Sequence, residues 1–127
     1  MEINPDIVCF LISKAKEFHA KEAVVIPEEP MNSSDDWALQ ILADHTEDLD
    51  YQEFSATIDD LEPDQQVELV ALMWLGRGDY EEEQWEEARA TAQRRRTKRT
   101  AEYLITTPLV ADYLEEGLAI LGYNCEE

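Results

Sequence analysis

The stretch 69–85, LVALMWLGRGDYEEEQW, decides the fold that we expect for this chain. It begins with seven apolar residues, continues with Gly76-Arg77-Gly78, and ends in an acidic segment. An apolar run that covers most of the circumference of a helix predicts burial on nearly all sides. Glycine readily takes the left-handed conformation that closes a helix. We therefore expect a buried helix over 63–75, stopped by Gly76 and Gly78, and a further helix after Asp79.

Apolar residues that recur three and four positions apart predict more helices on both sides of this stretch. The expected helices cover residues 5–20, 34–45, 50–61, 63–75, 80–98, 100–105 and 107–121. Asn4 with Pro5 is a favourable helix start, and Asp79 with Glu82 is expected to cap the helix 80–98. Residues 24–32 contain two prolines and a β-branched run, which predicts an extended connection between helices.

These patterns predict an all-α protein whose six or seven helices pack around the central helix 63–75. A chain of 127 residues is the usual size of one domain and can bury about two thirds of the surface that its unfolded form exposes. We expect residues 1–127 to form a single helical domain, with the N-terminal helix 5–20 packed on the remainder.

Charge is the strongest compositional signal. The chain has 30 acidic and 10 basic residues and a formal net charge of −20. Such a protein repels nucleic acids and anionic membranes and attracts basic partners, although acidity also serves solubility alone. Residues 22–88 contain 21 acidic residues and a single base, Arg77, whereas six of the ten bases lie within 89–99. The basic run 94–99 is a candidate for anion binding, but bases at a helix end also offset the helix dipole.

Two cysteines, Cys9 and Cys125, lie near opposite ends of the chain and belong to no metal-binding motif. We expect them to be free thiols, with Cys9 inert in an apolar helix face. The first residues lack the basic region of a secretory signal, and the apolar run 7–12 is too short to span a bilayer. The sequence thus predicts a soluble cytoplasmic protein with no membrane association.

No catalytic, cofactor-binding or metal-binding constellation is evident. Neither His19 nor His45 follows a glutamate at the spacing of a carboxylate-bridged metal pair. The acidic residues near 48–53 do not fit a calcium loop, and Gly76-Arg77-Gly78 lacks the length and lysine of a phosphate-binding loop. A DNA-binding helix-turn-helix would present three consecutive glutamates, 81–83, to phosphate groups.

Two long motifs carry a resemblance to a known family. They are LVALMWLGRGD (69–79), followed by WEEA (85–88), and YLITTPLVADYLEEGL (103–118). Over roughly residues 35–122, the chain resembles a bacterial family catalogued as domain of unknown function 3775. The resemblance implies a small, single-domain, all-helical protein and carries no catalytic residue. It places six polar or aromatic residues within the motifs: Trp74, Arg77, Asp79, Asp112, Glu115 and Glu116.

We favour a non-catalytic protein-interaction or regulatory module that binds a basic partner surface, or that forms homo-oligomers. An alternative is a small-ligand binder or enzyme with a pocket near Gly76-Arg77-Gly78. There, Arg77 would hold an anion, next to Asp79, while Asp112, Glu115 or Glu116 would serve as acid or base. A second alternative is a nucleic-acid mimic, in which ordered carboxylates imitate phosphates. Direct binding to nucleic acid is disfavoured by the net charge.

Overall fold

The computed structural model describes residues 1–20 and 47–125, and the regular structure in these ranges is all helical. The elements are α1 (Pro5–His19), α3 (Leu49–Asp59), α4 (Pro63–Arg77), the 3₁₀ turn η1 (Glu82–Gln84), α5 (Trp85–Arg94), α6 (Thr100–Ile105) and α7 (Val110–Ile120). The all-α prediction is confirmed. The helix predicted over 34–45 lies outside the described residues.

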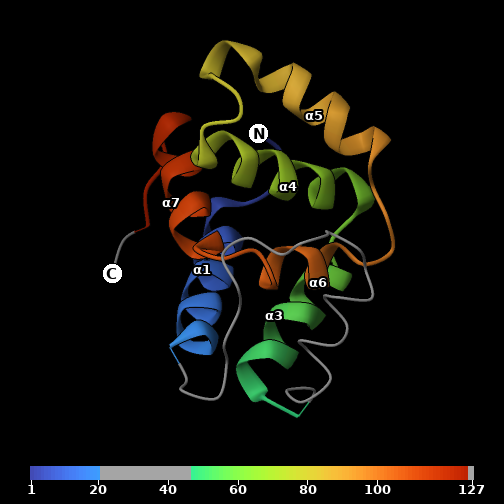
Figure 1. Ribbon diagram of the computed structural model, residues 1–127, viewed down its shortest axis with the longest axis vertical. Coiled ribbons are helices and arrows are strands. Elements are labelled where there is room, and N and C mark those ends of the chain that lie inside the picture. The colour runs from blue at the N-terminus through green and yellow to red at the C-terminus, as the bar shows by residue number, and fades with distance from the viewer. Residues whose placement is uncertain (21–46, 126–127) are drawn as a thin grey trace.

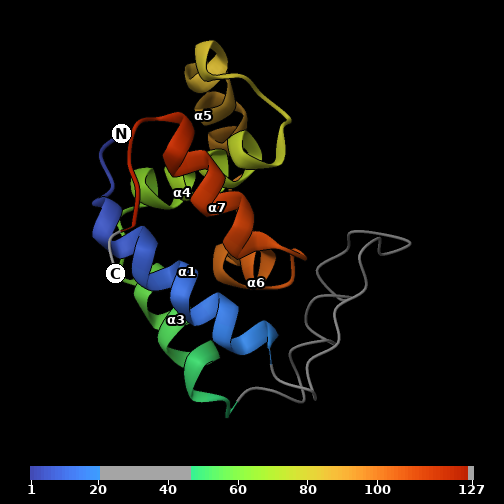
Figure 2. The same ribbon diagram turned by 90° about the vertical axis from the view of Figure 1, so that its left-hand side faces the viewer.

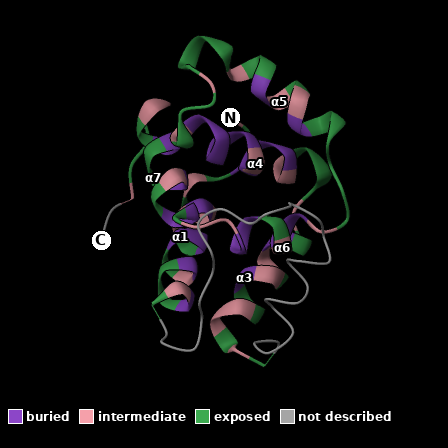
Figure 3. Cartoon of the chain, viewed as in Figure 1, coloured by how far each residue is buried: buried purple, intermediate pink, exposed green. Residues whose placement is uncertain are grey.

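Helix α4 occupies the centre of the molecule. Figures 1 and 2 both show it between α5 on one side and α6, α1 and α3 on the other, with α7 running alongside. Figure 3 shows that α4 is buried over most of its length. Its buried residues are Val67, Glu68, Leu69, Ala71, Leu72, Met73, Trp74 and Leu75. The expectation that the helix beginning at Pro63 forms the core is therefore confirmed.

The most extensive helix contact joins α4 to α7, and two glycines make it possible. A Cβ atom on Gly76 would overlap the carbonyl oxygen of Tyr113, and one on Gly117 would overlap the carbonyl oxygen of Leu72. The prediction that Gly76 ends the helix is wrong, because α4 continues to Arg77. Gly76 instead allows two helix backbones to touch.

Gly78 does end α4, as predicted. It adopts φ of 95°, and the amides of Gly78 and Asp79 donate to the carbonyls of Leu75 and Trp74 at 3.2 and 3.0 Å. This left-handed closure is typical of glycine at a helix end. It turns the chain back so that Asp79 lies beside Arg77, the last residue of α4.

The helix predicted over 80–98 is shorter than expected and begins differently. A 3₁₀ turn comes first, with a capping box formed by Glu81 and Gln84, and α5 covers only Trp85–Arg94. Asp79 does not cap this helix, because its carboxylate is bound by Arg77. After Arg94 the chain leaves the helix and crosses to α6.

The last helix also starts later than the predicted Thr107-Pro108 opening. The Thr107 amide donates to the Leu104 carbonyl at 3.0 Å, and its hydroxyl donates to the Tyr103 carbonyl at 2.8 Å. These bonds hold Thr107 to the end of α6, so α7 begins only at Val110. Leu109 precedes it with φ of 63°.

The N-terminal segment is held by a buried carboxylate on α4. The Glu68 side chain is fully buried and accepts hydrogen bonds from the amides of Glu2, at 2.8 and 2.9 Å, and Ile3, at 2.7 Å. Arg89 of α5 places its Nε 3.7 Å from the same carboxylate. A buried charge is tolerated when it is paired and hydrogen-bonded, so Glu68 ties three segments together.

Cys9 and Cys125 form a disulfide, with their Cα atoms 5.6 Å apart. The prediction of two free thiols is therefore wrong. Sequence spacing could not reveal the pairing, because 116 positions separate the two residues and only the fold brings α1 beside the C-terminal segment. Disulfides are typical of oxidising compartments. The cytoplasmic location that we predicted therefore loses the support of free thiols.

Candidate functional site

The end of α4 carries an ion pair that is fixed by the local backbone. The Nε and Nη2 atoms of Arg77 donate to one oxygen of Asp79, at 2.9 and 2.6 Å. Partial burial tends to lower the pKa of Arg77, but the hydrogen bond and charge of Asp79, together with the nearby Tyr103 hydroxyl, raise this pKa above its ordinary value. Arg77 therefore stays charged, with two of its five N–H donors bound to Asp79.

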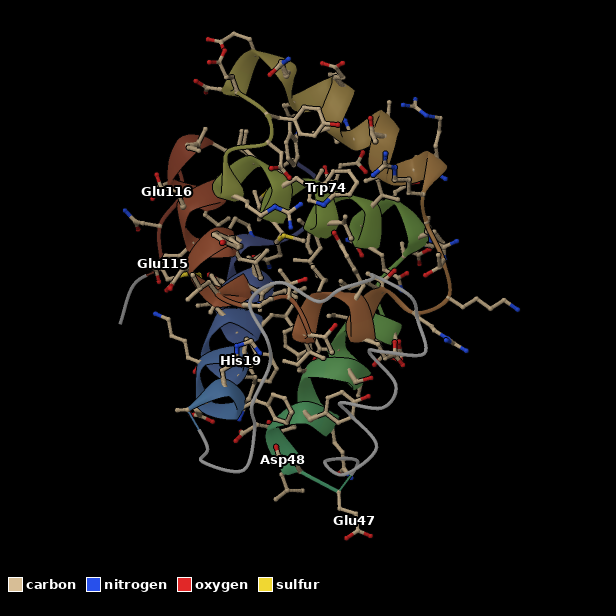
Figure 4. All side chains as sticks on the ribbon, viewed as in Figure 1. His19, Glu47, Asp48, Trp74, Glu115 and Glu116 are labelled. Atoms are coloured by element: carbon tan, nitrogen blue, oxygen red, sulfur yellow. A yellow bond between two sulfur atoms is a disulfide. The ribbon has the colours of Figure 1, made fainter. Side chains whose placement is uncertain are left out.

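Aromatic side chains flank this pair. The indole Nε1 of Trp74 donates to the hydroxyl oxygen of Tyr103, which lies on α6, at 3.0 Å. The ring of Tyr80 stacks on Trp74 with centroids 6.1 Å apart. Trp74 is almost completely buried, whereas Tyr103 is 40% exposed. Figure 4 shows Trp74 on the side of α4 that faces α5.

A surface hollow lies over these residues, and we call it the Trp74 hollow. It has two adjoining halves, both lined by Trp74, Arg95 and Tyr103. The charged half, about 260 Å³, is completed by Arg77, Asp79 and Tyr80. The apolar half, about 280 Å³, is completed by Val70, Ala92, Thr97 and Thr100. Small-ligand sites are concave surfaces with apolar walls and a few placed polar groups, and this hollow has both features.

Two polar groups of the hollow have unused hydrogen-bonding capacity. Arg95 is exposed, and within residues 1–20 and 47–125 its guanidinium has no ion pair or hydrogen bond. The Tyr103 oxygen accepts the indole proton, and no acceptor for its own proton occurs in the described part of the chain.

The structure separates the five predicted site residues into two groups. Arg77 and Asp79 line the Trp74 hollow. The other three, Asp112, Glu115 and Glu116, are exposed on α7 and do not line it. Figure 4 shows Glu115 and Glu116 at the left edge of the molecule, whereas Trp74 lies near its centre. Glu115 forms a surface ion pair with Lys16 at 3.2 Å.

Arg95 and Tyr103 were missing from the predicted site. Arg95 belongs to the basic run 94–99, but its position in the hollow depends on where α5 ends. Tyr103 stands at the start of the second family-like motif, and Trp74 lies within the first. The presence of both residues in family-like motifs was the signal in the sequence that could have identified them. It did not show that the two side chains are in contact.

Other polar clusters have structural explanations. His19 places Nε2 2.7 Å from the carbonyl oxygen of Ile105. Since a carbonyl only accepts, Nε2 carries the proton and links α1 to α6. In the described ranges no group of three or more His, Cys, Asp or Glu side chains is arranged to hold a metal ion. Within the same ranges no helix has both the length and the apolar character needed to cross a bilayer.

The fold and the hollow together define a small helical protein with a ligand-sized depression beside its central helix. Residues 51–123 match the family model described as protein of unknown function, DUF3775, so the chain belongs to this family. Every residue that lines the Trp74 hollow falls inside the matched region. No curated protein and no solved structure matches the chain.

Proposed function

We propose that this protein is a non-catalytic binding module that takes a small anionic ligand in the Trp74 hollow. The observation that carries the proposal is the pairing of Arg95, which has no counter-ion within the described residues, with a Tyr103 hydroxyl that is free to donate. Both groups line the two halves of the hollow. A cation and a hydroxyl donor in the lining of one hollow suit an anionic oxygen.

The same residues support binding rather than catalysis. A general base must reach the reacting proton with an available lone pair or charge. Among the described residues that line the hollow, Asp79 is the one carboxylate, and one of its oxygens already accepts two bonds from Arg77. This described part of the lining contains no histidine, cysteine or serine. It therefore offers groups that hold a ligand but no nucleophile paired with a base.

A thermal-shift screen of small anionic compounds tests this function. A ligand at ten times its Kd stabilises the folded state by about 1.4 kcal/mol, which corresponds to roughly 5 °C in Tm for a domain of this size. Arg95→Gln should reduce the shift to about a third or less. Arg96→Gln is the matched control, because Arg96 is exposed but lines neither half of the hollow. A screen with no hit, or an equal shift in the Arg95 variant, would refute the proposal.

The acidic surface supports a second candidate, an interaction with a basic protein. Glu81, Glu82 and Glu83 are consecutive and exposed around η1, a corner that projects from the molecule beside α5. Such a corner attracts basic surfaces and, on a larger scale, imitates nucleic-acid phosphates. Reversing these three charges to lysine should release a basic partner in low-salt pull-downs. Competition of the wild-type protein with DNA for that partner would indicate mimicry, and light scattering would show whether a second copy is the partner.

A further inference from the structure

We infer that the ligand of the Trp74 hollow is a monocarboxylate with an aromatic or branched apolar group. This inference rests on the proposed function and adds a chemical class to it. Three properties of the hollow carry it: its charge, the shape of its cationic group, and the division into two unlike halves. Each property excludes some of the anions that the proposed function alone would admit.

The charge of the hollow favours a single negative charge. Among residues 1–20 and 47–125, its lining includes two arginines, Arg77 and Arg95, and one carboxylate, Asp79, so these described residues give it a formal charge of +1. A monoanion neutralises this charge. A phosphate monoester, with nearly two negative charges at pH 7, would leave an excess beside Asp79 in a chain of net charge −20.

The donors of the hollow suit two coplanar oxygens. The guanidinium of Arg95 is a planar fork that binds a carboxylate through two parallel hydrogen bonds. The Tyr103 oxygen accepts the indole proton of Trp74, and the hydroxyl still has its own proton to donate to a ligand. Arg77 is less available, because Asp79 takes two of its donors. We therefore assign the carboxylate to Arg95 and Tyr103.

The apolar half of the hollow accommodates the apolar group of the ligand. Val70, Ala92 and the indole of Trp74 provide apolar surface next to Arg95, in a space of about 280 Å³. A cavity of about 150 Å³ in another protein accommodates benzene, so this half has room for one ring or a short branched chain. Thr97 and Thr100 also line this half. The fitting ligand thus has a carboxylate joined to an apolar group by a short linkage.

Isothermal titration with four probes tests the assignment: phenylacetate, acetate, 2-phenylethanol and phenyl phosphate. Phenylacetate should bind most tightly, because it alone fills both halves with the matching charge. Arg95→Gln should weaken phenylacetate binding by at least about tenfold, the usual effect of losing a charge-assisted hydrogen bond. Tyr103→Phe should weaken it severalfold, whereas Arg96→Gln should change it less than twofold.

The outcomes separate the two proposals. If phenyl phosphate binds more tightly than phenylacetate and requires Arg95, the monocarboxylate assignment is wrong and the anion-binding function stands. If 2-phenylethanol binds as tightly as phenylacetate, the carboxylate contributes nothing and both proposals fail. Both also fail if none of the probes binds in an Arg95-dependent way. Circular dichroism of each variant confirms that a loss of binding is not a loss of the helical fold.

Discussion

Replacing Glu68 by glutamine should destabilise the protein by about 3 kcal/mol. The carboxylate is fully buried and serves the amides of Glu2 and Ile3 and the nearby guanidinium of Arg89. Glutamine keeps the shape but replaces one acceptor oxygen by a donor, so a buried N–H loses its partner. Charge-assisted bonds contribute about 1.5–3 kcal/mol each, and removing one partner of a buried ion pair costs about 3–5 kcal/mol.

Urea unfolding followed by circular dichroism measures this change, and a drop of roughly 10 °C in Tm should accompany it. Glu86→Gln is the control, because Glu86 also pairs with Arg89, at 3.0 Å, but its side chain is 81% exposed. Exposed pairs contribute about 0–1 kcal/mol. Hydrogen exchange adds a local readout, since the Ile3 amide should lose protection only in the Glu68 variant. A loss below about 1 kcal/mol, or equal losses in the two variants, would refute the buried-anchor role.

Three further perturbations test the close helix contact, the disulfide and the surroundings of Tyr51. Gly76→Ala should cost about 3 kcal/mol in urea unfolding, because the added methyl overlaps the Tyr113 carbonyl; a gain of about 1 kcal/mol, the helix-propensity effect alone, would contradict the close helix contact. Reducing the Cys9–Cys125 disulfide should lower stability by up to about 5 kcal/mol, since it closes a loop of 116 positions, and Cys9→Ser should make the protein insensitive to dithiothreitol. Burial, then the charges of Glu102 and Asp59, raise the pKa of Tyr51 above 10.0. The unfolded chain therefore ionises first, so stability falls as pH rises above about 10, and Tyr51→Phe should flatten that fall.

Local signals in the sequence were sufficient to predict a helix boundary where a single residue sets it. Asn4 and Pro5 begin α1 as predicted, with the Asn4 side chain accepting from the Asp6 amide at 2.8 Å. Pro63 begins α4, and the predicted helix 100–105 matches α6. These boundaries depend on capping and on the fixed φ of proline, which act within a few residues. The chain needs no distant contact to set them.

The sequence was insufficient to predict the role of a residue where a contact with a distant part of the chain decides that role. Gly76 has the pattern of a helix terminator, but the backbone of α7 explains why glycine is needed there. The hollow follows the same rule, because its residues come from α4, α5, α6 and the connection after α5, and no linear spacing relates them.

The net charge leads to a last prediction about the Trp74 hollow. The chain has a net charge of −20, and the long-range repulsion of an anionic ligand by this charge is screened by salt. The contact between a bound carboxylate and Arg95 is shorter than the Debye length of about 10 Å at 0.1 M salt, and is screened less. Phenylacetate should therefore bind at least as tightly at 150 mM sodium chloride as at 10 mM. A steep loss of affinity over this range would show that screened attraction to exposed arginines dominates the binding, and would refute this reasoning.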